Sequence, residues 1–219
     1  MCEQHDYKHQ HFTVDDLIGN NRDWSQRMQQ KDPEFFSRLV DGQSPDFLWI
    51  GCGDSRVPAE SVLDVPPGTV FVHRSVANIV YNNDVNLMSA VEFAVDALKV
   101  KDILLVGHYG CGGVNASMNA PGNSGILDDW LHPIRQEYVR RREELAHLSN
   151  KEQHDRMCEI NVRMQVRNLA STRVVQRAWL RGQPLTIHGW CHSLKDGLIN
   201  DLECTVSGFD KVPQLYRLD

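Results

Sequence analysis

The sequence has no apolar stretch approaching the roughly 20 residues that a membrane-spanning helix needs. Its first residues are polar and contain no apolar signal core. We therefore expect no membrane partner and a location in the cytoplasm, or in an organelle lumen if a targeting peptide has been removed. Positive charge is also sparse, since 23 Lys and Arg stand against 29 Asp and Glu and the formal net charge is −6. This balance excludes a broadly basic protein of the kind that binds nucleic acid.

Cysteine is scarce as well. The six residues stand at positions 2, 52, 111, 158, 191 and 204, and this spacing does not match a disulfide framework. We expect free thiols in a reducing compartment. Cys52 and Cys111 follow apolar runs and stand beside other reactive residues, so a chemical role is predicted for these two.

The first reactive group follows an apolar run over residues 46–52, which predicts a buried strand. Cys52, Asp54 and Arg56 then occupy every second position. In extended backbone, alternate side chains point to the same side. A thiol, a carboxylate and a guanidinium should therefore converge at the carboxyl end of a strand, which is where open α/β sheets place their ligands.

A second apolar run, over residues 103–107, leads into His108 and Cys111. Two thiolates and one imidazole form a donor set for zinc, and three protein ligands leave a fourth coordination position. A structural zinc site closes that position, whereas a catalytic site keeps it for water or substrate. The long separation from Cys52 does not fit the zinc-finger pattern. From spacing alone, two unrelated buried cysteines and a core histidine are an alternative interpretation.

The two motifs in this order, Cys-x-Asp-x-Arg and His-x-x-Cys, resemble the β-class carbonic anhydrases, and within them a bacterial-like subset. The similarity extends from about Leu17 to Gly208. It is carried by Phe-Leu-Trp-Ile-Gly-Cys (47–52), Asp-Ser-Arg-Val-Pro-Ala-Glu (54–60), Phe-Val-His-Arg (71–74), Val-Ala-Asn (76–78), Gly-His-Tyr-Gly-Cys-Gly-Gly-Val (107–114) and Ile-His-Gly-Trp (187–190). The resemblance implies reversible hydration of carbon dioxide to bicarbonate and a proton, with Zn²⁺ as the cofactor.

The resemblance also implies a role for each residue of the two motifs. Zinc is expected on Cys52, His108 and Cys111, where it lowers the pKa of water; the value of about 7 is known for the carbonic anhydrases with three histidine ligands. Arg56 is expected to hold Asp54 by a bidentate contact, and Asp54 to aim the attacking hydroxyl at carbon dioxide. In a closed state, Asp54 leaves Arg56 and becomes the fourth zinc ligand. The alternative for this pair is a surface ion pair of little consequence.

Four further residues are placed at the substrate by the resemblance: Gln43, Phe71, Val76 and the backbone amide of Gly112. Gln43 is expected to hydrogen-bond bicarbonate oxygens. Phe71 and Val76 give the pocket an apolar wall, which suits uncharged carbon dioxide. Packing in the core explains Phe71 and Val76 equally well.

A regulatory site is implied too. In the bacterial-like subset, a non-catalytic bicarbonate lies near residues matching Trp49 and Arg74, with Val57 in the same motif, and it favours the closed state. The tyrosine of that site is replaced here by His192. Protonation of His192 would add positive charge, so the bicarbonate affinity should rise as the pH falls. The alternative is a core Trp49, an Arg74 that pairs with an acid and an exposed His192.

The order of the apolar segments predicts an α/β fold with a mainly parallel central sheet flanked by helices. Strands are expected at residues 46–52, 69–73, 103–107, 185–188 and 202–207, the last antiparallel, and helices at 86–100, 128–148 and 155–181. Residues 1–12 are polar and predict a disordered or loosely ordered tail, and residues 13–219 are predicted to form one domain.

An N-terminal helical arm is predicted to begin with Thr13 as its cap. Its apolar face, which includes Leu17, Trp24 and Met28, is narrow and needs a partner surface. In the family that the chain resembles, such an arm packs on a neighbouring subunit, which implies a homodimer or tetramer. Packing on the chain's own domain is the alternative.

Two other functions stay open. Enzymes with the same fold and zinc set act on sulfur analogues, so a hydrolase of carbon disulfide or carbonyl sulfide is one alternative. A closed structural zinc site, with Asp54 as the fourth ligand, would make the chain an interaction protein. The presence of Arg56 argues against this second alternative, because Arg56 can hold Asp54 away from the metal.

Overall fold

The computed structural model describes residues 11–120 and 125–218, which divide into two compact units, Met1–Gln43 and Ser44–Asp219. The tail predicted for residues 1–12 lies almost wholly outside the described residues, and the single domain predicted for residues 13–219 spans both units. Both therefore stay predictions. Within the described ranges, no helix combines the length and the apolar character needed to cross a membrane.

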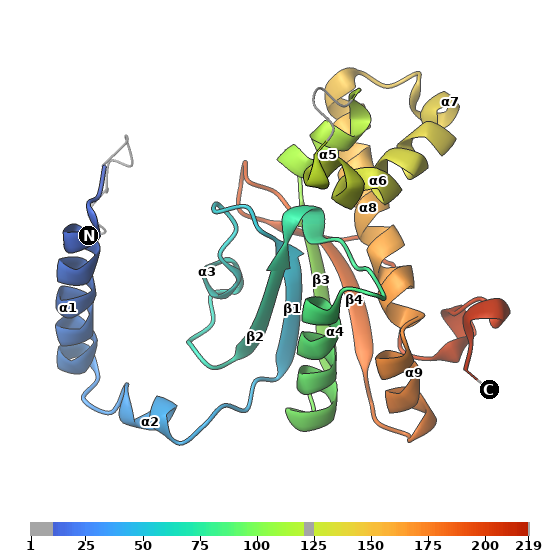
Figure 1. The fold of residues 1–219 in the computed structure, drawn as a ribbon. Helices are drawn as coiled ribbons and strands as arrows, with labels where there is room; N and C mark the ends of the chain where they lie inside the picture. Colours follow the sequence, from blue (N-terminus) through green and yellow to red (C-terminus); the bar gives the residue numbers. More distant parts are fainter. Residues whose placement is uncertain (1–10, 121–124, 219) are drawn as a thin grey trace. The chain divides into compact units, whose positions relative to one another are not determined.

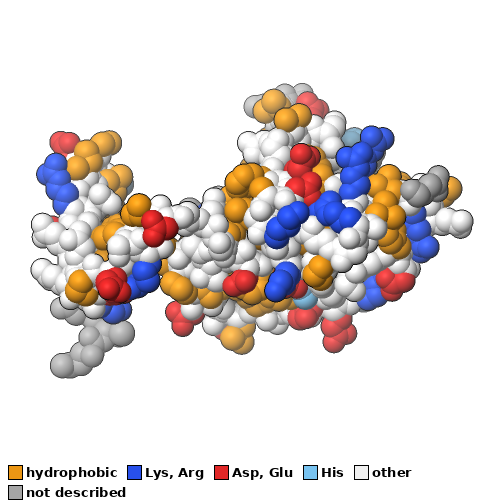
Figure 2. Space-filling model, turned by 90° about the horizontal axis from the view of Figure 1, so that it is seen from below, with side chains coloured by type: hydrophobic (Ala, Val, Ile, Leu, Met, Phe, Trp, Pro, Cys, Tyr) orange, Lys and Arg blue, Asp and Glu red, His pale blue; other side chains and the backbone are white. Residues whose placement is uncertain are grey.

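The first unit contains α1 (Val14–Lys31) and α2 (Ser37–Val40). Thr13 caps α1 as predicted. Its Oγ1 accepts a hydrogen bond from the Asp16 amide at 3.2 Å, and the Asp16 carboxylate accepts one from the Thr13 amide at 2.7 Å. No residue of α1 is buried, so its apolar side chains lie on the surface of this unit (Figure 2).

Five strands form one sheet in the second unit, in the order β2-β1-β3-β4-β5 (Figure 1). The first four run parallel and β5 is antiparallel, which confirms the predicted α/β fold. The strands are β1 (Phe47–Cys52), β2 (Val70–Ser75), β3 (Asp102–His108), β4 (Thr186–His192) and β5 (Ile199–Asp201). Nearly every residue of β1 and β3 is buried, and this is why their sequences are continuous apolar runs.

Helices cover one face of the sheet more fully than the other. On the first face, a large core cluster joins α4, α5, α6, α8 and α9 to Leu48, Ile50 and Leu105. On the second face, Trp49 and Val106 pack with the short α3. The helices of this unit are α3 (Ala59–Leu63), α4 (Val85–Glu92), α5 (Gly112–Met118), α6 (Ile126–Arg140), α7 (Arg142–Leu145), α8 (Asn150–Ala170) and α9 (Arg173–Leu180).

Glycine allows α8 to approach the sheet closely at two points. A Cβ atom at Gly107 would lie 2.5 Å from Val162 Cγ2, and one at Gly189 would lie 2.9 Å from Val166 Cγ2. Both valines belong to α8, so this helix lies directly against β3 and β4, as Figure 1 also shows.

The strand predicted at residues 202–207 is wrong. β5 lies earlier, and Val206 pairs only through an isolated bridge with Ile187. Glu203 adopts a left-handed conformation with a φ of 54°, which interrupts the extended backbone between the two. β4, in contrast, continues to His192 instead of ending at residue 188, so it reaches the carboxyl edge of the sheet.

Three helices that were predicted from the spacing of apolar residues are interrupted in the structure, where a capping side chain or the local backbone conformation ends the regular helix. The helix expected at residues 155–181 is divided into α8 and α9, because the Thr172 side chain caps α9. The helix expected at 86–100 continues past α4 only as a π-helical turn, Phe93–Ala97. The helix expected at 128–148 is divided into α6 and α7 at Arg141.

Candidate metal centre

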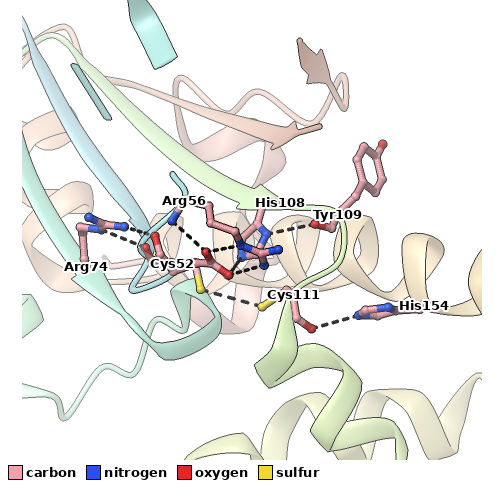
Figure 3. Close-up of polar contacts among 8 residues, drawn as sticks. Cys52, Arg56, Arg74, His108, Tyr109, Cys111 and His154 are labelled. Carbon is pink, nitrogen blue, oxygen red and sulfur yellow. Dashed lines mark hydrogen bonds and ion pairs between the residues drawn. The ribbon is translucent and has the colours of Figure 1, made fainter. Parts of the chain in front are cut away.

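The three predicted zinc ligands meet at the carboxyl edge of the sheet (Figure 3). Cys52 is the last residue of β1 and His108 the last residue of β3, and these strands are parallel neighbours. Cys111 is the N-cap residue of α5. The Cys52 and Cys111 sulfur atoms lie 3.9 Å apart, and the candidate ligand atoms of all three residues lie within 4.8 Å of one another. The sheet therefore brings together residues that are far apart in the sequence.

The imidazole is oriented to bind a cation. His108 Nδ1 lies 3.0 Å from the Tyr109 carbonyl oxygen, which can only accept, so Nδ1 carries the proton. Nε2 then has a free lone pair, and it is buried without a hydrogen-bond partner among the described residues. A buried acceptor without a partner is unfavourable. Two cysteine sulfurs and this nitrogen are a donor set that suits Zn²⁺, so the residues fit that ion.

The two thiols control each other's ionisation. A hydrogen bond from the Cys111 thiol lowers the pKa of Cys52 to about 4. The hydrogen bond to Cys52 raises the pKa of Cys111, and burial raises it further. One proton therefore leaves easily, while the second is retained because two thiolates would repel each other. A dication bound to both sulfurs would offset this repulsion, so metal binding should release the second proton.

Asp54 and Arg56 form the predicted bidentate pair beside these ligands. Arg56 Nε donates to Asp54 Oδ1 at 2.9 Å, and Nη2 donates to Oδ2 at 2.7 Å. These hydrogen bonds from Arg56 hold the pKa of the Asp54 carboxyl far below its usual range, so the group is ionised at neutral pH. Oδ2 also lies 3.7 Å from His108 Nε2. The carboxylate therefore lies next to the ligand cluster while Arg56 holds it.

Arg74 has a structural contact that the sequence did not reveal. Its Nε donates to the Cys52 carbonyl oxygen at 3.0 Å, and its Nη2 donates to the Asp54 carbonyl oxygen. Neither interpretation from the sequence, a bicarbonate ligand or a partner of an acid, includes these backbone contacts. Arg74 therefore holds the segment that carries Cys52 and Asp54. No local sequence pattern signals these contacts, because they depend on the parallel pairing of β1 with β2.

The four predicted substrate residues lie in different settings. Gly112 is the first residue of α5, directly after Cys111. Val76 follows β2 and is 44% exposed, so it is not a core residue. A Cβ atom at Gly113 would lie 3.1 Å from Val76 Cγ1, which places Val76 against the loop that carries Cys111. Phe71 is half-buried and packs on the core and on Phe93. Gln43 is exposed and ends the first unit, so its role stays a prediction.

The predicted regulatory residues lie on the sparsely covered face. Trp49 and Val57 belong to its core cluster, and the Trp49 indole nitrogen is buried without a partner among the described residues. His192 is buried, and the alternative that made it exposed is wrong. Burial lowers the pKa of His192, which is opposite to what a protonated histidine at neutral pH would need. The structure therefore gives no support to bicarbonate affinity that rises as the pH falls.

Comparison with known proteins agrees with this site. Residues 47–199 match the family described as carbonic anhydrase. A carbonic anhydrase of Emericella nidulans is 41% identical over 208 residues, which cover 94% of this chain and 91% of the relative. The Coccomyxa β-carbonic anhydrase in complex with acetazolamide has a TM-score of 0.86 and 38% identity, over 91% of this chain and 90% of that chain. This chain belongs to the β-class carbonic anhydrases.

A further β-carbonic anhydrase structure shares most of the fold. It is one of two tetrameric β-carbonic anhydrases from Sordaria macrospora. Its TM-score is 0.83, and it is 36% identical over 87% of this chain and 97% of that chain. The assignment to a bacterial-like subset of the β-carbonic anhydrases is not tested by these relatives and stays a prediction.

Proposed function

We propose that this chain hydrates carbon dioxide reversibly to bicarbonate and a proton, with Zn²⁺ held by Cys52, His108 and Cys111. The observation that carries the proposal is the buried, unpartnered Nε2 of His108, which lies beside two thiols and a carboxylate fixed by Arg56. Zn²⁺ in such a site acts as a Lewis acid and supplies hydroxide near neutral pH.

The chain's own residues orient the reaction. The ionised Asp54 can only accept a hydrogen bond, so it takes one from the attacking hydroxyl and directs the oxygen lone pair to the carbon of carbon dioxide. Arg56 keeps the carboxylate in that position. The exposed side chain of Val76 offers an apolar contact, which suits an uncharged substrate. The carbon–oxygen bond that forms yields bicarbonate, and the proton passes to solvent.

Parallel assays test this function. Stopped-flow measurement should show carbon dioxide hydration by the zinc-loaded protein, whereas carbon disulfide and carbonyl sulfide should release no sulfide above background. Sulfide release without carbon dioxide hydration would favour the sulfur-analogue hydrolase. Inactivity on all three substrates with one zinc per chain would favour a structural site. The bidentate hold of Arg56 on Asp54 argues against that last outcome, because a closed site needs Asp54 on the metal.

A homodimer, or a tetramer built from dimers, is proposed for the assembly. Trp24 of α1 packs on Phe35 and Phe36 of the same unit, but Leu17 and Ile18 are 54% and 50% exposed, so the first part of the apolar face lacks a partner within this unit. We expect light scattering at micromolar concentration to give two or four times the chain mass of 25.0 kDa. L17K should shift the protein toward the monomer, because it places a charge in the apolar face. Q26K adds the same charge at another exposed position of α1 and should have little effect. A wild-type monomer would contradict the prediction.

Regulation by a second bicarbonate is proposed at Trp49 and Arg74. A Cβ atom at Gly51 would collide with the Trp49 indole nitrogen, and Gly51 pairs in register with Arg74, so the indole N–H and Arg74 occupy neighbouring positions. An anion on Arg74 would compete with the carbonyl oxygens of Cys52 and Asp54. Bicarbonate would thereby loosen the segment that carries Asp54 and favour the closed state.

Bicarbonate inhibition of W49F tests this proposal. The substitution removes the unpartnered N–H while keeping an aromatic ring, so we expect weaker inhibition and unchanged zinc content. W179F removes an indole N–H that bonds the Leu185 carbonyl elsewhere, and it should behave like the wild type. Burial lowers the pKa of His192, so this residue should stay neutral around neutral pH. We therefore expect His192 to add little pH dependence to the inhibition by bicarbonate. Identical inhibition curves for the wild type, W49F and R74A would rule out the second site.

A further inference from the structure

Helix α8 contacts the loop that carries two of the three candidate zinc ligands, His108 and Cys111. His154 of α8 lies with its Nε2 3.0 Å from the Cys111 carbonyl oxygen (Figure 3). Since a carbonyl can only accept, Nε2 carries the proton and donates. The same oxygen also accepts a hydrogen bond from the Asn115 amide, at 3.0 Å, in the first turn of α5. Cys111 is thus held both by its own helix and by a side chain from α8.

Tyr109 forms a second connection to the same loop. Its carbonyl oxygen accepts from His108 Nδ1 and so fixes the tautomer of the imidazole. Its hydroxyl donates to Glu159 Oε1 of α8 at 2.9 Å and accepts from Asn200 Nδ2 of β5 at 3.0 Å. Arg156 donates to the other oxygen of Glu159 at 2.7 Å. The backbone atom that orients His108 is therefore anchored, through the Tyr109 side chain, to two other elements.

The supporting helix is itself firmly placed. A capping box between Ser149 and Glu152 fixes the start of α8, and His154 lies one turn after the first residue of the helix, Asn150. Gly107 allows the helix to approach β3, as described above, and Cys158, one turn after His154, is buried. His154 and Glu159 therefore project toward the loop from a fixed helix on the side of His108 and Cys111.

We propose, on the basis of the zinc function proposed above, that His154 and Tyr109 are positioning residues of the metal centre. His154 holds the backbone of Cys111, and Tyr109, anchored by Glu159 and Asn200, holds the ring of His108. Movement of this loop away from Cys52 would separate the three ligands and release Zn²⁺. The two contacts oppose that movement, so they keep Zn²⁺ bound for longer. Outer contacts of this kind typically change metal affinity by roughly 10- to 100-fold.

The test measures the rate at which zinc-loaded protein transfers Zn²⁺ to a coloured chelator in excess. H154L and Y109F should each release zinc roughly 10- to 100-fold faster than the wild type. H154Q carries an amide nitrogen at the position of Nε2, so it should restore slow release. Y138F removes a hydroxyl that bonds Gln153, a contact between α6 and α8 away from the loop, and should match the wild type.

Spectra of the cobalt-substituted proteins separate positioning from general support of the fold. Changed cobalt bands in H154L and Y109F, but not in Y138F, would show that the ligand geometry itself has altered. If H154L does not fold, Y109F carries the test alone, since it keeps the aromatic ring. Equal release rates in all zinc-loaded proteins would overturn this inference and leave the proposed zinc function intact. A wild-type protein that binds no zinc would overturn both.

Discussion

Replacing Asp54 with Asn should lower the turnover of carbon dioxide hydration by roughly 10²- to 10⁴-fold, while one zinc per chain is retained. Asn has nearly the same shape but presents an amide that can donate, so the attacking hydroxyl is no longer held by an obligatory acceptor. The pKa of Asp54 is held far below its usual range by hydrogen bonds from Arg56. Asp54 itself should therefore contribute no inflection to the pH profile near neutrality. Stopped-flow hydration together with metal analysis measures both quantities.

Variants of Arg56 show whether geometry or charge matters in this pair. R56A leaves Asp54 ionised at neutral pH but free to rotate, and it should also reduce turnover strongly. R56K keeps the charge without the fork that contacts both carboxylate oxygens, so it should recover only part of the activity. R140A removes an exposed arginine whose carboxylate partner is Glu137, and it serves as the control. Unchanged turnover in D54N and R56A would exclude the pair from the mechanism.

Replacing Cys111 with Ser should remove most of the zinc. The substitution replaces a thiolate ligand with a neutral hydroxyl. It should therefore lower the zinc affinity by more than the roughly 10- to 100-fold that is typical for the loss of an outer contact. Metal analysis after dialysis against a weak chelator gives the zinc content of each variant. Hydration should fall in proportion to the zinc that is lost.

A matched cysteine variant controls for the loss of a thiol as such. Cys204 is half-buried, and its sulfur lies 3.8 Å from the Gly189 carbonyl oxygen, outside the ligand cluster. C204S should retain one zinc per chain. Full zinc retention in C111S would remove Cys111 from the ligand set.

The core of this site could be predicted because parallel strands end at one edge of a sheet. Cys52 and His108 each terminate an apolar run, so the sheet places them side by side without any knowledge of loops. The Asp54–Arg56 contact spans two residues and depends only on local backbone. Family resemblance added the assignment of roles, and the structure brought the same residues together.

The parts that could not be predicted depend on contacts between distant segments. Arg74 holds the Cys52 carbonyl oxygen through the pairing of β1 with β2, and His154 reaches Cys111 from a helix 43 positions away in the sequence. Neither contact leaves a local pattern. The wrong strand at 202–207 has a different cause, since one left-handed residue, Glu203, interrupts a run whose composition favours extension.

X-ray absorption at the zinc edge of the loaded wild-type protein tests the central claim most directly, because it counts the donor atoms around the metal. We predict two sulfur atoms at about 2.3 Å and one imidazole nitrogen at about 2.0–2.1 Å, with a light atom in the fourth position. In C111S the sulfur count should fall to one. A wild-type zinc surrounded by four nitrogen or oxygen atoms, or by three or more sulfurs, would contradict a site made by Cys52, His108 and Cys111.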